Sequence, residues 1–130
     1  MKYVSIDIET TGLDTKNDQI LMVAMIVEDT ENKLPREELP TFSCLVMHSD
    51  EGAEQRYEGS PFALWLNAWI FEALAKNDES KYKIYSQTAW HGPALNFLNQ
   101  HFGPQKVVAA GKNVGSFDLQ FFPILSPLYL

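Results

Sequence analysis

The segment KYVSIDIETTGLD, residues 2–14, constrains the fold more than any other part of the chain. The β-branched and aromatic run at 3–8 predicts a strand. Asp7 and Glu9 stand two positions apart, so a strand places both carboxylates on one face and their apolar neighbours on the other. Two like charges on one face are costly unless a cation lies between them, and hard oxygen ligands suit a divalent cation. The segment therefore favours a metal site, while a strand face that merely meets water remains the alternative.

The rest of the chain predicts a mixed-sheet α/β domain. The run ILMVAMIVE at 20–28 is almost continuously apolar and predicts a strand buried on both faces. Short polar connections to the strands on either side favour an antiparallel meander. Residues 29–40 and 78–85 are expected to be connections. Further strands are expected at 41–47 and 106–110, and helices at 60–77, within 88–102 and from 117 onward, which gives the order β-β-β-α-α-β-α.

Helix boundaries are signalled by particular residues. Ser60 and Pro61 suit the N-cap and the first helical position, and Gly103 suits a helix end. Apolar residues recur at helical spacing after Pro61, which predicts a wide stripe packed on the sheet. The large aromatic side chains of that stripe are expected in the core: Phe62, Trp65 and Trp69.

Charge and cysteine content exclude some classes of protein. The net charge of −7 argues against a broad basic surface that holds nucleic acid. No apolar run is long enough to cross a bilayer, and no signal peptide precedes the first strand, so no membrane association is expected. Cys44 is the single cysteine and lies in an apolar run, which predicts a buried thiol and an intracellular, cytoplasmic location.

A second informative segment, GKNVGSFDLQFF, begins at Gly111. Its glycine-bearing turn follows an expected strand and places Asp118 near the start of a helix, where an acid is favoured by the helix dipole. Taken alone, Asp118 is an ordinary residue of a first helical turn. Together with Asp7 and Glu9, it makes a plausible set of carboxylates for a two-metal site.

The two segments together resemble the first and second motifs of the DEDD superfamily of 3′–5′ exonucleases, in the family's order and spacing. The resemblance implies a ribonuclease H-like fold, a mixed sheet flanked by helices. It also implies hydrolysis of phosphodiester bonds at the 3′ end of DNA or RNA, with two Mg²⁺ or Mn²⁺ ions. The implied metal-binding and catalytic positions are Asp7, Glu9 and Asp118, and the implied substrate-binding positions are Thr10, Thr11, Leu13, Asn113 and Phe117.

The family's third motif, a histidine or tyrosine base shortly before a fourth acid, has no counterpart here. Twelve residues follow Asp118 and none is Asp, Glu or His. Residues 1–130 are therefore expected to be the N-terminal portion of an exonuclease-like domain that lacks the final strand and helix and is inactive by itself. We expect the three histidines to be ordinary surface or helix residues: His48, His91 and His101.

The absent third motif leaves other functions open. One alternative is a catalytically inactive pseudo-nuclease that binds nucleic acid or protein. Another is an unrelated acidic α/β interaction domain. The expected partner is the 3′ end of a single-stranded or short nucleic acid, and an uncovered sheet edge would permit a homo-oligomer.

Overall fold

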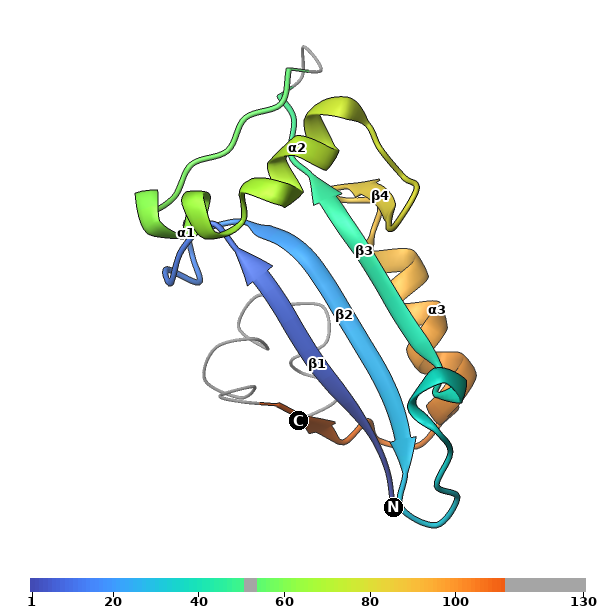
Figure 1. Ribbon diagram of the computed structural model, residues 1–130. Helices are drawn as coiled ribbons and strands as arrows, with labels where there is room; N and C mark the ends of the chain where they lie inside the picture. The colour runs from blue at the N-terminus through green and yellow to red at the C-terminus, as the bar shows by residue number, and fades with distance from the viewer. Residues whose placement is uncertain (51–53, 112–130) are drawn as a thin grey trace. The chain divides into compact units, whose positions relative to one another are not determined.

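A computed structural model describes residues 1–50 and 54–111 (Figure 1). The helix expected from 117 onward lies outside these residues, and so do Asn113, Phe117 and Asp118. The expected lack of a final strand and helix and the expected domain bounds are not tested. The described elements are β1 (Lys2–Thr10), β2 (Ile20–Asp29), the 3₁₀ turn η1 (Arg36–Glu38), β3 (Thr41–Met47), α1 (Pro61–Leu66), α2 (Ala68–Lys76), β4 (Lys83–Ser86), α3 (His91–Phe102) and β5 (Ala109–Ala110).

The strands form a five-stranded sheet in the order β4-β3-β2-β1-β5. Figure 1 shows β2 running against β1 and β3, as the short connections predict. β4 pairs in parallel with β3, and β5 pairs in parallel with β1, where Val4 is opposite Ala109 and Ser5 is opposite Ala110. The sheet is therefore mixed, and the predicted α/β class is confirmed.

Alternation along β1 agrees with the sequence pattern. Val4, Ile6, Ile8 and Thr10 are buried, while the intervening positions are exposed or half-buried. The strand predicted at 20–28 is confirmed as β2, but its predicted burial on both faces was wrong. Leu21, Val23, Met25 and Val27 are buried, whereas the residues between them are only half-buried, so the strand is fully covered on one face only.

The helix expected at 60–77 begins and ends as predicted but is broken in the middle. The Ser60 side chain accepts a hydrogen bond from the backbone N–H of Ala63 (3.2 Å), and Asn77 ends α2 with a left-handed backbone, φ 50°. Asn67 separates α1 from α2 and is itself buried. Its polar side chain interrupts the apolar stripe.

The predicted core position of the three aromatic side chains was wrong. Phe62 is 68% exposed, Trp65 71% and Trp69 45%. The covered face of this segment is formed instead by Ile70 and Leu74 of α2, and no residue of α1 is buried. Helical spacing does not distinguish the two faces when both are apolar.

Two further elements differ from the expectation. β4 lies where a connection was expected, because the intervening helices provide a crossover long enough for its parallel pairing with β3. β5 has only two residues, whereas a strand was expected over 106–110. α3 begins at His91, within the expected range 88–102. α3 ends as predicted, since Gly103 follows it with φ 58°.

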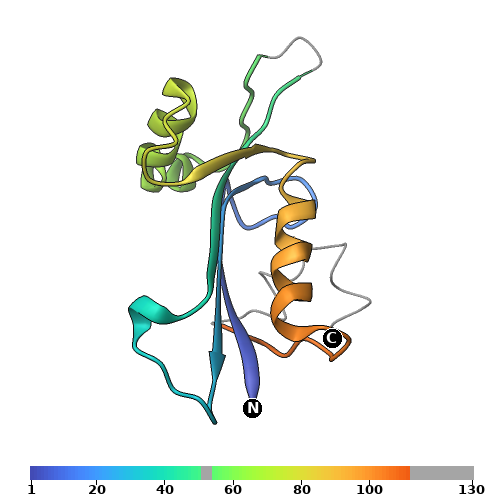
Figure 2. The same ribbon diagram turned by 90° about the vertical axis from the view of Figure 1, so that its right-hand side faces the viewer.

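The chain divides into two compact units. Among the described residues, one comprises Met1–Asp7, Ala24–Phe42 and 91–111, and the other comprises Ile8–Val23, 43–50 and 54–90. In the first unit, α3 contributes three buried residues, and the rings of Phe42 and Phe97 lie 5.9 Å apart; Figure 2 shows α3 in side view. The second unit has a core built from Leu21, Leu45, Ile70 and Leu74.

Cys44 is fully buried, as predicted, and burial raises the pKa of its thiol to about 12. Within the described part of the chain, no helix has the length and apolar character that a membrane span requires.

Candidate metal and nucleic-acid site

Asp7 and Glu9 both lie on β1, at alternate positions that face away from its buried residues. Asp7 is exposed and Glu9 is half-buried. Because the flanking Ile6 and Ile8 are buried, β1 is fixed in this register, since a slip by one residue would bury both carboxylates. The strand therefore presents two carboxylates on its less buried face.

Asp7 lines a pocket of about 480 Å³ in its own unit, together with Ser5 of β1, Ala24 and Ile26 of β2, Gly111 and Arg36. The pocket combines an acid, an arginine and the half-buried apolar face of β2. Such a mixture can accept an anionic group beside the carboxylate, because the guanidinium presents several N–H donors.

The turn that follows β1 is held by Thr11, whose side chain is fully buried. Its backbone N–H donates to the Gln19 carbonyl (2.9 Å), and its Oγ1 accepts from the Gln19 backbone N–H (2.8 Å). Thr10 is also buried, and its Oγ1 donates to the Gly12 carbonyl (2.6 Å). Both threonine side chains thus build the turn, and their implied contact with a nucleotide stays a prediction.

Leu13 has a different environment, because 84% of its surface is exposed. Beside it, the Asp14 carboxylate accepts bonds from the Lys16 backbone (2.9 Å) and from the Asn17 side chain (2.7 Å), and these donors lower its pKa. The Asp18 carboxylate accepts from the Asp14 backbone (2.8 Å). The acids of this turn therefore serve to shape it, and Leu13 projects from a rigid support.

Two contacts join the end of β1 to the helices of the same unit. The Ser60 backbone N–H donates to the Thr11 carbonyl (2.8 Å), and Asn67 Nδ2 donates to the Thr10 carbonyl (3.1 Å). Gly59 leaves no room for a side chain, since a Cβ there would lie 1.9 Å from the Thr11 carbonyl oxygen. The turn after the carboxylates and the start of α1 are thus fastened together.

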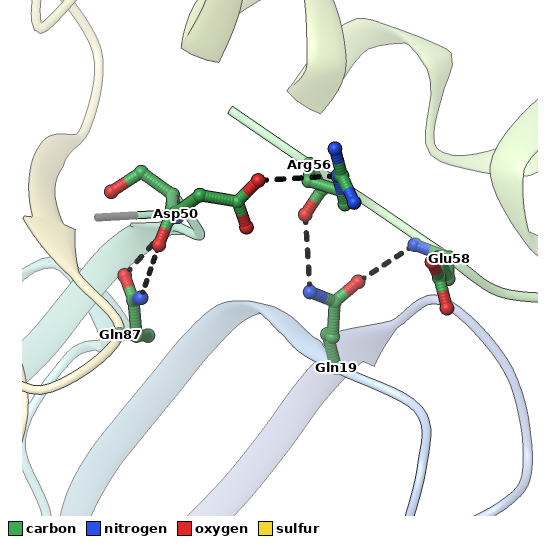
Figure 3. Close-up of polar contacts among 6 residues, drawn as sticks. Gln19, Asp50, Arg56, Glu58 and Gln87 are labelled. Atoms are coloured by element: carbon green, nitrogen blue, oxygen red, sulfur yellow. Dashed lines mark hydrogen bonds and ion pairs between the residues drawn. The ribbon is translucent and has the colours of Figure 1, made fainter. Parts of the chain in front are cut away.

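Two glutamines hold the polar link before α1 (Figure 3). The Gln19 amide donates to the Arg56 carbonyl (3.2 Å) and accepts from the Glu58 backbone N–H (2.9 Å). Gln87 Nε2 donates to the Ser49 carbonyl (2.9 Å). Gln19 therefore connects the link to the turn built by Thr11.

His91 and His101 lie in α3, as predicted, whereas His48 is half-buried in the link after β3 and is neither a surface nor a helix residue. His48 Nε2 donates to the Ile20 carbonyl (2.6 Å), and burial lowers its pKa. Burial also lowers the pKa of His91, whereas the His101 ring packs on Phe97 with centroids 4.8 Å apart.

A divalent metal requires more ligands than β1 alone provides. Among residues 1–50 and 54–111, no three His, Cys, Asp or Glu side chains are grouped so as to hold an ion. The two β1 carboxylates fit Mg²⁺ or Mn²⁺ in donor chemistry, since both ions prefer oxygen ligands. Asp118, the expected third acid, lies outside the described residues.

Structural comparison places this architecture among known folds. E. coli exonuclease I in complex with a dT13 oligonucleotide matches with a TM-score of 0.65 and 20% sequence identity, over 92% of this chain and 22% of that chain. The chain has a ribonuclease H-like fold. The predicted resemblance is thereby confirmed at the level of the fold.

Two further exonuclease I structures match to a similar extent. The product-bound form has a TM-score of 0.64 at 20% identity, over 92% of this chain and 24% of that chain. The zinc-bound complex with single-stranded DNA has a TM-score of 0.64 at 20% identity, over 92% of this chain and 22% of that chain. This chain thus spans less than a quarter of the exonuclease I chains it matches. No protein-family model and no curated protein sequence matches it.

Sequence reasoning missed the residues that support the site. Asn67, Gly59 and Gln19 were not singled out, although each makes or permits a contact to the turn after β1. A signal for Asn67 was available, since it is a polar residue within an apolar helical stripe. The role of Gly59 depends on a contact 48 residues away in sequence, which no local pattern encodes.

Proposed function

We propose that this chain is the metal-binding portion of a 3′–5′ exonuclease, which hydrolyses phosphodiester bonds at the 3′ end of DNA or RNA. The observation that carries the proposal is β1, an apolar strand that presents Asp7 and Glu9 on its less buried face within the exonuclease fold. The E. coli exonuclease I complexes with single-stranded DNA support a single-stranded end as substrate.

In this proposal Asp7, Glu9 and Asp118 hold two Mg²⁺ or Mn²⁺ ions. Ions of this kind activate the attacking water and stabilise the leaving oxygen. The exposed Leu13 packs on the terminal base. Thr10 and Thr11 fix the backbone of the turn and so hold Leu13 in position. Asn113 and Phe117 position the loop that carries Asp118.

The metal site is tested by titrating Mn²⁺ calorimetrically into the purified chain. Asp7→Asn and Glu9→Gln should each weaken binding by about tenfold or more, because each removes a ligand charge. Glu37→Gln is the matched control, since it removes one exposed acid from η1 and should leave the affinity unchanged. Equal affinities for all four proteins would refute the metal site.

Activity is tested separately with a 5′-labelled single strand and Mn²⁺. Stepwise shortening from the 3′ end that disappears in Asp7→Asn would support the exonuclease. Mn²⁺ binding without shortening, by this chain and by a longer chain that contains it, would refute hydrolysis and favour the inactive binding module.

A further inference from the structure

The second compact unit carries two pairs of aromatic side chains, three of them on α1 and α2 and the fourth, Tyr82, immediately before β4. Phe62 and Trp65 of α1 have ring centroids 6.0 Å apart, and Trp69 of α2 lies 5.9 Å from the ring of Tyr82. We call these four residues the aromatic band. Phe62 and Trp65 are more than two-thirds exposed, and Trp69 is nearly half exposed. None of the four is buried, although Tyr82 is half-buried and packs against the core of this unit.

Packing does not explain why α1 has this composition. Its sequence is PFALWL, and none of its six residues is buried. Three of its large side chains are more than half exposed: Phe62, Trp65 and Leu66. Isolated exposed apolar residues are ordinary, but a contiguous group of this kind marks an interaction surface.

The local charge at the aromatic band does not repel a polyanion, although the whole chain is acidic. The whole chain has a net charge of −7, but α1 contains no charged residue, and the charges of α2 are Glu72 and Lys76, which form an ion pair (2.7 Å). Beyond the band, a pocket of about 310 Å³ is lined by Trp69 and Tyr82 and by the charged residues Glu72, Lys76, Asp78 and Lys81. These charges balance. A phosphate chain therefore meets no net repulsion along the band, and at its end it meets two lysines together with two acids.

The band is fastened to the strand end that carries the proposed site. Ser60, immediately before α1, donates to the Thr11 carbonyl (2.8 Å), and Asn67, between α1 and α2, donates to the Thr10 carbonyl (3.1 Å). Glu9, Thr10, Thr11 and the whole band belong to the same compact unit. A strand whose end lies at Glu9 can therefore continue on to the band without leaving this unit.

We propose that the aromatic band is a stacking track for the unpaired bases of a single-stranded nucleic acid, next to its 3′-terminal nucleotide. Aromatic rings stack on the bases of single strands with little regard to sequence, since every base has a π-face. Base stacking also suits an acidic protein, because it needs no basic surface. The inference rests on the proposed function, since it takes the 3′ end to lie at β1.

The test measures binding of fluorescein-labelled dT and U oligonucleotides to the full chain by anisotropy. EDTA is present, so that neither hydrolysis nor the metal site contributes. Trp65→Ala should weaken binding about 5- to 150-fold, the range for loss of one stacked base. Trp65→Phe should restore most of the affinity. Trp65→Leu should not, because it keeps the apolar area but loses the π-face.

The salt dependence gives a second readout. Two lysines, Lys76 and Lys81, line the pocket beside this track, so the slope of log K against log salt should be about −1.4 when both neutralise phosphates. Leu34→Ala is the matched control, since Leu34 is an exposed apolar residue in the other unit and its removal should leave the affinity unchanged. Trp65 is largely exposed, so the folded state should tolerate all three substitutions, which thermal unfolding verifies.

Unchanged oligonucleotide affinity in Trp65→Ala would overturn the stacking track, as would equal affinities in Trp65→Phe and Trp65→Leu. A Trp65→Ala chain that loses a self-associated state in gel filtration, with no loss of oligonucleotide affinity, would also overturn it and make α1 a contact between copies. Failure of the proposed metal site appears in the Mn²⁺ titration instead. The two failures are therefore distinguishable.

Discussion

Gly59→Ala tests the junction between β1 and α1. An added Cβ would lie 1.9 Å from the Thr11 carbonyl oxygen, 2.6 Å from its carbonyl carbon and 2.5 Å from Thr11 Cβ. Two of these atoms belong to the backbone, and Thr11 is fully buried, so neither partner can move aside by a rotamer change. The junction must open, and the hydrogen bond from Ser60 to Thr11 is lost with it.

The expected cost follows from these contacts. Overpacking of this severity costs about 3 kcal/mol, and the lost hydrogen bond about 1 kcal/mol more. Alanine offsets less than about 1 kcal/mol by restricting the unfolded chain. The net loss is about 3 kcal/mol, and for a chain of 130 residues each kcal/mol shifts the melting temperature by about 4 °C. We therefore expect the melting temperature to fall by about 12 °C.

Calorimetry or circular dichroism measures this shift, with Gly92→Ala as the matched control. A Cβ at Gly92 meets no atom within 4 Å, and the residue lies in the first turn of α3, where alanine is preferred over glycine. Gly92→Ala should thus be neutral or slightly stabilising. If Gly59→Ala unfolds at the same temperature as Gly92→Ala, the close approach of Gly59 to Thr11 does not exist in solution.

Three further predictions concern buried polar groups. Asn67→Ala should lower the free energy of unfolding by about 1–3 kcal/mol in urea titrations, because it leaves the Thr10 carbonyl without its donor; no change would exclude that bond. Burial lowers the pKa of His48 and of His91, so the unfolded chain binds more protons below about pH 6.5 and stability should fall as the pH drops through that value. The fall in stability should be smaller in His48→Gln than in the parent chain. An equal fall would refute the contribution of His48. The Cys44 thiol, with a pKa of about 12, should react with a thiol reagent at mildly alkaline pH only as fast as the protein unfolds, and rapid labelling of the native chain would contradict its burial.

The strand positions were predictable where one face is apolar and the other polar. In β1, buried Ile6 and Ile8 alternate with Asp7 and Glu9, so the sequence pattern specifies the register and hence the face that carries the carboxylates. Local chemistry likewise specified the helix start at Ser60, because its capping bond spans only three residues.

The features that sequence did not predict depend on distant contacts. β4 is short and lies at the edge of the sheet, and its strand conformation follows from pairing with β3 across two helices. The exposed side of α1 could not be chosen from spacing, since the helical segment is apolar on more than one face. Likewise, the hydrogen bonds that hold Thr11 come from Gln19 and Ser60, which only the folded chain brings together.

The three tryptophans differ sharply in burial, with Trp90 at 2% exposed and Trp65 and Trp69 largely at the surface. Two of the three indoles are therefore exposed to solvent in the native state. The tryptophan fluorescence of the native protein should already be red-shifted and quenched by acrylamide. Unfolding should change this signal less than in a protein whose indoles are all internal. An optical assay of folding in this protein thus depends mainly on Trp90, and the other two indoles report on whatever touches the surface.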